Sequence, residues 1–255
     1  MQEEKTGKTI QSIHRALDIL EYLVFSGQGK RLSEISEACG LNKTTAFHII
    51  KTLEMRGYLE QSPDTLRYKH GGMLYQIATK VYQNIDIIAY YTPAMQKLYQ
   101  TYNETVTLYL FQHYNRQTDW QAVCIHALES TASIHVSIPV GTWYPLINTA
   151  IGRLYLSAMN QEDLQQYLSS EKNLSEKQAD KLKEALAQIR STHCCVEQNE
   201  YEDGITNIAA PIYKLSGRVL AALCVSIPSH RAAQLIEPVT KDVVRCAEQL
   251  TAMNI

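Results

Sequence analysis

Several common sequence features are missing from this chain. It contains no apolar run of about eighteen residues, so we expect no membrane-spanning helix and no membrane partner. The N-terminal segment, residues 1–17, lacks the apolar core of a signal peptide, which predicts a cytoplasmic protein. There is no internal repeat and no low-complexity segment. A chain of 255 residues without these features is long enough for one large globular domain or two smaller ones.

The six cysteines follow no metal-binding or disulfide pattern. Their spacing fits neither a zinc ribbon nor a disulfide framework, and most lie inside apolar runs, where a free cysteine behaves as a small hydrophobe. The adjacent pair Cys194–Cys195, beside His193, is the only arrangement that suggests a metal or a nucleophile, but no second Cys or His pair stands at metal spacing. We therefore expect a reducing compartment and no bound metal.

The motifs of several enzyme classes are also missing. The sequence has no Gly-x-Ser-x-Gly, no phosphate-binding loop, and no pair of carboxylates with a clear acid–base role. We therefore predict no catalytic residues and no cofactor.

Neither sign of charge dominates the chain, whose formal net charge is -2. Residues 1–70 contain ten Lys or Arg and nine Asp or Glu, which gives +1, and residues 71–255 contain fourteen against seventeen, which gives −3. This is not the charge of a protein that binds a polyanion through a bulk basic surface. Any contact with nucleic acid must come from locally placed basic residues.

Three short helices are predicted before residue 58. The first ends at the Gly27–Gly29 pair, the second begins at the expected N-cap Ser33, and the third runs from its expected N-cap Asn42 to Gly57. Two apolar stripes at helical spacing support this assignment: Ile13, Leu17, Leu20 and Val24 in the first helix, and Ala46, Ile49, Ile50 and Leu53 in the third. The stripe of the third helix must face the other two helices, which leaves its polar side pointing outward.

A β-hairpin is predicted immediately after the third helix. Apolar and polar residues alternate on both sides of Ser62-Pro63-Asp64, which is typical of two strands joined by a turn. Arg67 and Lys69 lie two residues apart, so they share one face of the second strand. Three helices closed by a hairpin form a winged helix-turn-helix.

The polar side of the third helix predicts contact with double-stranded DNA. An α-helix fits the major groove of B-DNA, where exposed side chains near its N-terminus reach base edges. The alternative is a small three-helix subdomain whose polar face is only solvated, but the basic pair on the hairpin favours DNA. A two-fold symmetric reader would bind a pseudo-palindromic operator. The candidate DNA-contacting residues are Ser33, Lys43, Thr44, Thr45, His48, Lys51, Arg67 and Lys69.

The remainder of the chain predicts a linker and an α+β domain. Residues 72–91 form a helix in which Met73, Ile77, Val81, Ile85 and Ile88 recur roughly every four residues. This stripe packs either on a second subunit or in the chain's own core. Helices and alternating strands follow, including an expected strand at residues 132–141. The predicted domains are therefore 1–71 for DNA binding, 72–91 for the linker helix, and 92–255.

Three segments in this order resemble the IclR family of bacterial transcription regulators. They are LSEISEACGLNKTTAFHIIKTLEMRGYL (32–59), GTWYPLINTAIGRLYLSAM (141–159) and GITNIAAPIYKLSGRVLAALCVSIPSHR (204–231). The resemblance covers nearly the whole chain. It implies an N-terminal winged helix-turn-helix, a linker helix, and a C-terminal GAF-like α/β domain that binds a small-molecule effector. It also implies a homodimer, possibly a tetramer, in a family of repressors and activators.

The resemblance also implies an effector site. The N–H groups of Ala150 and Ile151 would hold a small organic acid, because they belong to a helix start that follows a loop. Other residues match pocket positions of the family: Leu146, Glu197, Asn207, Cys224 and Ser226. The alternatives are a plain helix start at Ala150, an inert core thiol at Cys224 and a solvated acid at Glu197.

Two positions depart from the family pattern. His48 stands where the family often has Arg, and a neutral His cannot make the bidentate contacts of a guanidinium, so the operator sequence cannot be carried over. Arg153 follows Gly152 where the family favours Lys.

Three aromatic residues flank the pocket loop: Trp143, Tyr144 and Tyr155. They either narrow the pocket or belong to the core. The alternatives to an effector-binding regulator are a DNA-binding protein whose second domain only oligomerises, and a GAF-like enzyme.

Overall fold

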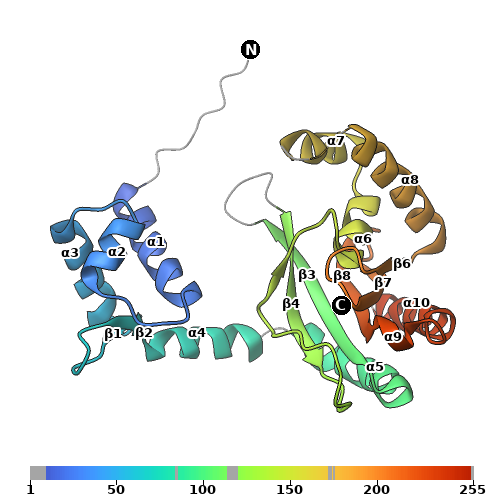
Figure 1. Cartoon of the computed structure of the whole chain (residues 1–255), viewed down its shortest axis with the longest axis horizontal. Coiled ribbons are helices and arrows are strands. Elements are labelled where there is room, and N and C mark those ends of the chain that lie inside the picture. The colour runs from blue at the N-terminus through green and yellow to red at the C-terminus, as the bar shows by residue number, and fades with distance from the viewer. Residues whose placement is uncertain (1–9, 84–85, 114–119, 172–173, 175, 254–255) are drawn as a thin grey trace. The chain divides into compact units, whose positions relative to one another are not determined.

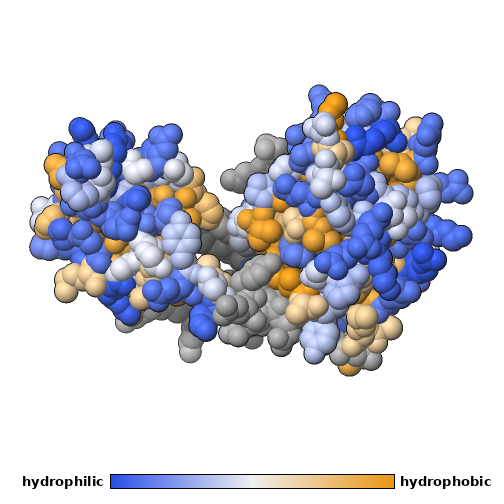
Figure 2. All heavy atoms as spheres, turned by 90° about the horizontal axis from the view of Figure 1, so that it is seen from below, coloured by the Kyte–Doolittle hydropathy of each residue, from blue (hydrophilic) through white to orange (hydrophobic). Residues whose placement is uncertain are grey.

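The computed structural model describes residues 10–83, 86–113, 120–171, 174 and 176–253. The chain forms two compact units, residues 1–85 and 86–255. Figure 1 shows a small helical unit and a larger unit built on a sheet. The face drawn in Figure 2 is mainly hydrophilic on both units, with smaller apolar patches. None of the described helices is long and apolar enough to cross a membrane.

The first unit is a winged helix-turn-helix, as predicted. It contains α1 (Gln11–Phe25), α2 (Leu32–Ala38), α3 (Lys43–Met55), β1 (Leu59–Gln61), β2 (Tyr68–His70) and α4 (Gly72–Gln83). The two strands are antiparallel, and Glu60 lies directly opposite Lys69. The core brings together side chains from α1, α2, α3 and the hairpin: Ile19, Leu23, Ile35, Ala46, Ile50, Leu59 and Tyr68.

The second helix begins two residues earlier than the predicted N-cap implies. Its N-cap is Arg31 rather than Ser33, and Ser33 lies exposed in the first turn. The Glu34 carboxylate accepts the N–H of Arg31 at 2.8 Å, and this bond satisfies the helix start in place of a serine hydroxyl. The assignment of Ser33 as the N-cap is therefore wrong.

The first helix is present, but of its predicted apolar stripe only Leu20 packs against the core. Ile13 and Leu17 are 55% and 48% exposed, whereas Ile19 and Leu23 are almost fully buried. The helix carries a second set of apolar residues beside the predicted stripe. This second set, which includes Ile19 and Leu23, faces the core. The stripe formed by Ile10, Ile13, Leu17 and Val24 is therefore open on the surface of this unit.

Two described helices cover the predicted linker helix of residues 72–91. Helix α4 ends at Gln83, and α5 (Asp86–Tyr102) runs beyond the predicted end at residue 91. Of the predicted stripe, Ile77 on α4 is 41% exposed and Ile88 on α5 is buried; the side chains of Val81 and Ile85 lie outside the described residues. The domain boundaries at residues 71 and 91 stay predictions.

The second unit is an antiparallel sheet with helices on both faces. The strand order is β5 (Trp143–Tyr144), β4 (Trp120–Leu128), β3 (Thr105–His113), β8 (Val219–Pro228), β7 (Ile205–Tyr213), β6 (Cys195–Gln198). Helices α5 and α10 (Ile236–Ala252) pack on one face, while α6 (Ala150–Ala158) packs on the other with α8 (Glu176–Thr192) behind it (Figure 1). The short helices α7 (Gln161–Ser170) and α9 (Ser229–Ala232) complete the unit.

The strand predicted at residues 132–141 is absent from the structure. This segment has no regular secondary structure, although Val136 and Ile138 are buried and Ile134 is exposed. All three side chains line a cavity. The alternation of apolar residues therefore reflects the wall of a cavity rather than a strand in a ladder.

Candidate DNA interface and ligand cavity

The polar side of α3 is presented outward. The Asn42 side chain accepts the N–H of Thr45 at 2.8 Å and caps the helix as predicted. Ala46 and Ile50 are completely buried, so the opposite side of the helix faces solvent. Its exposed candidates are Lys43, Thr44 and His48, whereas Thr45 and Lys51 are partly buried.

Three of the four basic candidates are paired with carboxylates inside the first unit. The Lys51 ammonium lies 2.7 Å from Glu54, and the Lys69 ammonium lies 2.8 Å from Glu60. Arg67 is held differently, because its Nη1 donates to the carbonyl of Gly29 at 2.8 Å and lies 3.1 Å from Glu34. Lys43 has no ion pair with any residue that the structure describes.

The contacts of Arg67 tie the wing to the start of α2. The backbone groups of Lys30 and Tyr68 exchange two hydrogen bonds of 2.9 and 2.7 Å beside it. Glu34 completes the link, since it accepts from both Arg31 and Arg67. Arg67 therefore positions the wing, in contrast to Lys69, whose side chain is 53% exposed and bound only to Glu60.

An exposed aromatic residue, Phe47, also lies on the outward side of α3. Its side chain is 40% exposed, lies edge-on to the ring of His48, and lies 5.8 Å beneath the Lys51 ammonium. Sequence analysis did not select Phe47, because large aromatic residues are expected in the core. Its spacing of four residues from both Lys43 and Lys51 is the signal that places it on the polar face.

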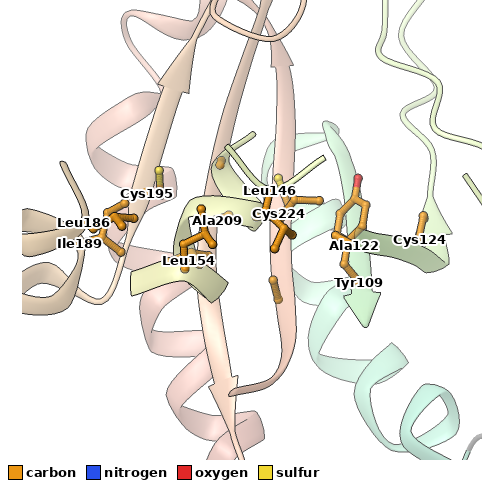
Figure 3. Packing of buried hydrophobic residues seen from close by; sticks show 14 of the residues in the cluster. Tyr109, Ala122, Cys124, Leu146, Leu154, Leu186, Ile189, Cys195, Ala209 and Cys224 are labelled. Atoms are coloured by element: carbon orange, nitrogen blue, oxygen red, sulfur yellow. The ribbon is translucent and has the colours of Figure 1, made fainter. Parts of the chain in front are cut away.

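A cavity of about 250 Å³ opens in the second unit. It lies between the start of α6, the α6-facing side of β3, β7 and β8, the segment 134–138, and the loop 201–205. Figure 3 shows part of the buried cluster of this unit, including Leu146, Leu154 and Cys224. Four of the seven predicted effector residues line the cavity: Ala150, Ile151, Asn207 and Cys224.

The N-terminus of α6 forms one wall of this cavity. The Thr149 hydroxyl caps the helix by accepting the N–H of Gly152 at 3.1 Å, and it donates to the carbonyl of Pro145 at 2.6 Å. The N–H groups of Ala150 and Ile151 have no hydrogen-bond partner among the described residues. They are the unpaired donors of a helix start, so they can receive an anion.

The close approach of this helix to Leu146 depends on Gly152. A Cβ atom on Gly152 would overlap the backbone of Leu146, so only glycine lets the first turn of α6 lie there. Leu146 itself is completely buried and does not line the cavity. Its role is to support the helix start.

Two further predicted residues, Glu197 and Ser226, lie behind the cavity wall. Glu197, Asn207 and Ser226 are opposite one another on β6, β7 and β8. Asn207 donates to Glu197 at 2.7 Å and accepts from the Ser226 hydroxyl at 2.7 Å. Neither Glu197 nor Ser226 lines the cavity, and both are completely buried. They hold Asn207 in position rather than face the open space.

Glu197 also fixes the loop that forms the rim of the cavity. Its second carboxylate oxygen accepts the N–H groups of Glu200 and Tyr201 at 2.7 and 3.1 Å. Arg153 binds the same loop, because its guanidinium pairs with Glu200 at 2.5 Å while its Nε donates to the carbonyl of Ile147 at 2.8 Å. The start of α6 and the loop that carries Tyr201 are thus connected.

The cavity is rich in tyrosine and lacks cations. Tyr109, Tyr144 and Tyr201 line it with edge-on ring contacts of 5.7 and 5.8 Å. Burial raises the pKa of Tyr144 to about 12 and the pKa of Tyr109 well above its usual value, so both phenols stay neutral near pH 7. No Lys or Arg of the described residues lines the cavity. Its polar lining residues are Ser137, Thr149 and Asn207, together with His135 and Glu202.

Tyr155 packs against the core of the second unit, to which Cys195 and Cys224 belong. Tyr155 stacks on Phe111 with ring centroids 4.4 Å apart, and neither it nor Trp143 lines the cavity. Burial raises the pKa of Cys224 to about 12 and of Cys195 also to about 12, so both thiols stay protonated. Among the described residues no group of His, Cys, Asp and Glu could hold a metal ion.

The chain is similar to known transcription regulators over nearly its whole length. Residues 12–63 match the IclR helix-turn-helix domain, and residues 79–252 match the bacterial transcriptional regulator IclR C-terminal domain. The HTH-type transcriptional regulator KdgR of Escherichia coli is 25% identical over 91% of this chain and 87% of that protein. The acetate operon repressor of Salmonella typhimurium is 25% identical over 96% of this chain and 90% of that protein.

Solved structures show the same fold. The IclR transcriptional regulator from Alicyclobacillus acidocaldarius has a TM-score of 0.80 at 19% identity, covering 96% of this chain and 99% of that one. An IclR homologue from Microbacterium hydrocarbonoxydans, complexed with 4-hydroxybenzoate, has a TM-score of 0.78 at 19% identity, covering 94% and 98%.

A winged helix-turn-helix unit followed by a separate sheet unit, with these domain matches, defines a DNA-binding transcription regulator. The two matched domains cover most of the chain. The chain belongs to the IclR family of bacterial transcriptional regulators. The relatives named above are regulators and not enzymes.

Proposed function

We propose that the cavity of the second unit binds a small organic acid and that this binding changes the affinity of the protein for its operator. The observation that carries the proposal is the pair of unpartnered N–H groups, on Ala150 and Ile151, at the helix start that walls the cavity. A helix N-terminus stabilises a carboxylate through these donors and through its dipole. No Lys or Arg of the described part lines the cavity, so the protein without ligand has no unpaired buried cation at this site.

The remainder of the cavity favours a small ligand with an apolar or aromatic body. Its volume of about 250 Å³ lies below the range of about 300–1,000 Å³ that drug-sized ligands occupy. Val136, Ile138 and Ile205 offer apolar contact, and three tyrosines offer ring contact and hydroxyl donors. The complex of a relative with 4-hydroxybenzoate supports an acid of this size and kind.

The first test compares acids with their neutral amides. Thermal-shift and calorimetric titrations would use 4-hydroxybenzoate, benzoate and short aliphatic acids, each beside its amide. We expect the acids to raise the melting temperature more than the amides, because only a carboxylate gains from the helix start. Equal stabilisation by acid and amide would contradict the carboxylate site. No stabilisation by any ligand would favour the alternative that the second unit only oligomerises.

A variant at the first residue of α6 makes the test specific. Ala150→Pro removes one N–H at a position where proline suits a helix, and the preceding Thr149 has the extended conformation that proline requires. Ala150→Val adds similar bulk but keeps the N–H. We expect the proline variant to lose about tenfold or more in acid affinity, as for a hydrogen bond to a charged group, relative to the valine variant. Equal affinity in both variants would exclude this N–H from the site.

We further propose that the protein acts as a homodimer on a pseudo-palindromic operator. The exposed apolar stripe of α1, formed by Ile10, Ile13, Leu17 and Val24, supports a contact with a second copy, because such stripes are usually covered. Leu17→Glu should lower the molar mass measured by light scattering. Leu215→Glu, at an exposed apolar position in the second unit, should not. A dimer that survives Leu17→Glu would exclude α1 from the interface.

A further inference from the structure

Two lysines of the first unit, Lys51 and Lys69, each pair with a nearby glutamate. Lys69 on β2 lies directly opposite Glu60 on β1, and their charged groups are 2.8 Å apart. Lys51 lies one turn before Glu54 on α3, at 2.7 Å. Two of the three candidate lysines, Lys51 and Lys69, therefore already hold a carboxylate, which is an anion of the same kind as a phosphate oxygen.

These pairs are exposed and can open. The side chains of Lys69 and Glu60 are 53% and 54% exposed, and those of Lys51 and Glu54 are 42% and 28% exposed. The Glu60 carboxylate raises the pKa of Lys69, and the Lys69 ammonium lowers the pKa of Glu60, so both groups stay charged around neutral pH. Exposed pairs of this kind are only weakly stabilising. A DNA phosphate can therefore bind the lysine ammonium, but it must compete with the glutamate carboxylate that is already paired with it.

We propose that Glu54 and Glu60 act as intramolecular phosphate mimics that limit the sequence-independent affinity of this protein for DNA. The proposal rests on the proposed contacts of Lys51 and Lys69 with the DNA backbone. It agrees with the charge of the first 70 residues, where ten basic residues are offset by nine acidic ones. A lysine that must leave a carboxylate gains less from phosphate, and the freed carboxylate takes up a cation in return. The dependence of binding on salt is therefore also reduced.

Glu37 provides a matched control on the same unit. It is an exposed acid on α2 that has no ion pair or side-chain hydrogen bond among the described residues. Glu37→Gln removes the same charge as Glu60→Gln but frees no lysine. Any effect that follows from net charge alone is therefore measured by Glu37→Gln.

The experiment measures binding of the full-length protein to a random-sequence duplex by fluorescence anisotropy at several salt concentrations. We expect Glu60→Gln and Glu54→Gln each to tighten binding about two- to fivefold. The slope of log affinity against log salt should become steeper by up to about one unit for each freed lysine. Glu37→Gln should change the affinity and the slope much less. Equal effects in all three variants would show that only net charge matters and would overturn the proposal.

A double-mutant cycle separates this proposal from the interface on which it depends. If Glu60 acts through Lys69, Glu60→Gln should have no effect in a Lys69→Ala background. If it still tightens binding there, Glu60 repels phosphate directly and the proposal is wrong. If Lys69→Ala alone leaves DNA affinity unchanged, the proposed contact itself fails, which is a different result from the same set of variants. Lys51 and Glu54 give an independent second cycle.

Discussion

At the scale of single residues, the cavity depends on groups that do not line it. Glu197 is completely buried, yet its carboxylate accepts three hydrogen bonds that hold Asn207 and the loop carrying Tyr201. Gly152 has a comparable role, because the absence of a side chain lets the start of α6 lie against Leu146. Positions of this kind control the shape of the cavity, whereas Ala150 and Asn207 control its chemistry.

The first prediction at this scale concerns Gly152. Gly152→Ala should destabilise the second unit by about 1–3 kcal/mol or more, because its Cβ overlaps backbone that cannot move aside as a side chain can. Both tryptophans, Trp120 and Trp143, lie in the second unit, so the urea midpoint followed by their fluorescence reports this unit. An unchanged midpoint in Gly152→Ala would contradict the close approach.

At the scale of elements, local signals could be read from the sequence and long-range ones could not. Helix α3 was predicted with its N-cap and its inward stripe, because capping and helical spacing are local properties. Ser33 was misassigned because Glu34 satisfies the helix start instead. Residues 132–141 were misread as a strand because cavity walls can also alternate. The lining residues Tyr109 and Tyr201 were missed, since nothing local links β3 to the 199–204 loop.

Helix α3 carries the second prediction. Phe47 is exposed among polar groups on the outward side of α3, and an apolar side chain there can contact the methyl group of thymine. Phe47→Ala should weaken binding to an operator selected from a random library by about 1 kcal/mol or more, and should barely change binding to random duplex. Met55→Ala, at an 87% exposed apolar position near the end of the same helix, is the control. Equal losses on both duplexes would mean that Phe47 supports the fold rather than reads bases.

At the scale of the whole molecule, regulation requires that the ligand and the operator influence each other. Linkage demands reciprocity: if an acid changes operator affinity by a given factor, saturating operator must change acid affinity by the same factor. Calorimetric titration of the acid, with and without operator duplex, measures that factor directly. We expect a coupling of about 1–3 kcal/mol, which Ala150→Pro should weaken together with acid binding. If the acid binds equally well with and without operator, the cavity binds a ligand without regulating DNA, and the second unit serves another purpose such as assembly.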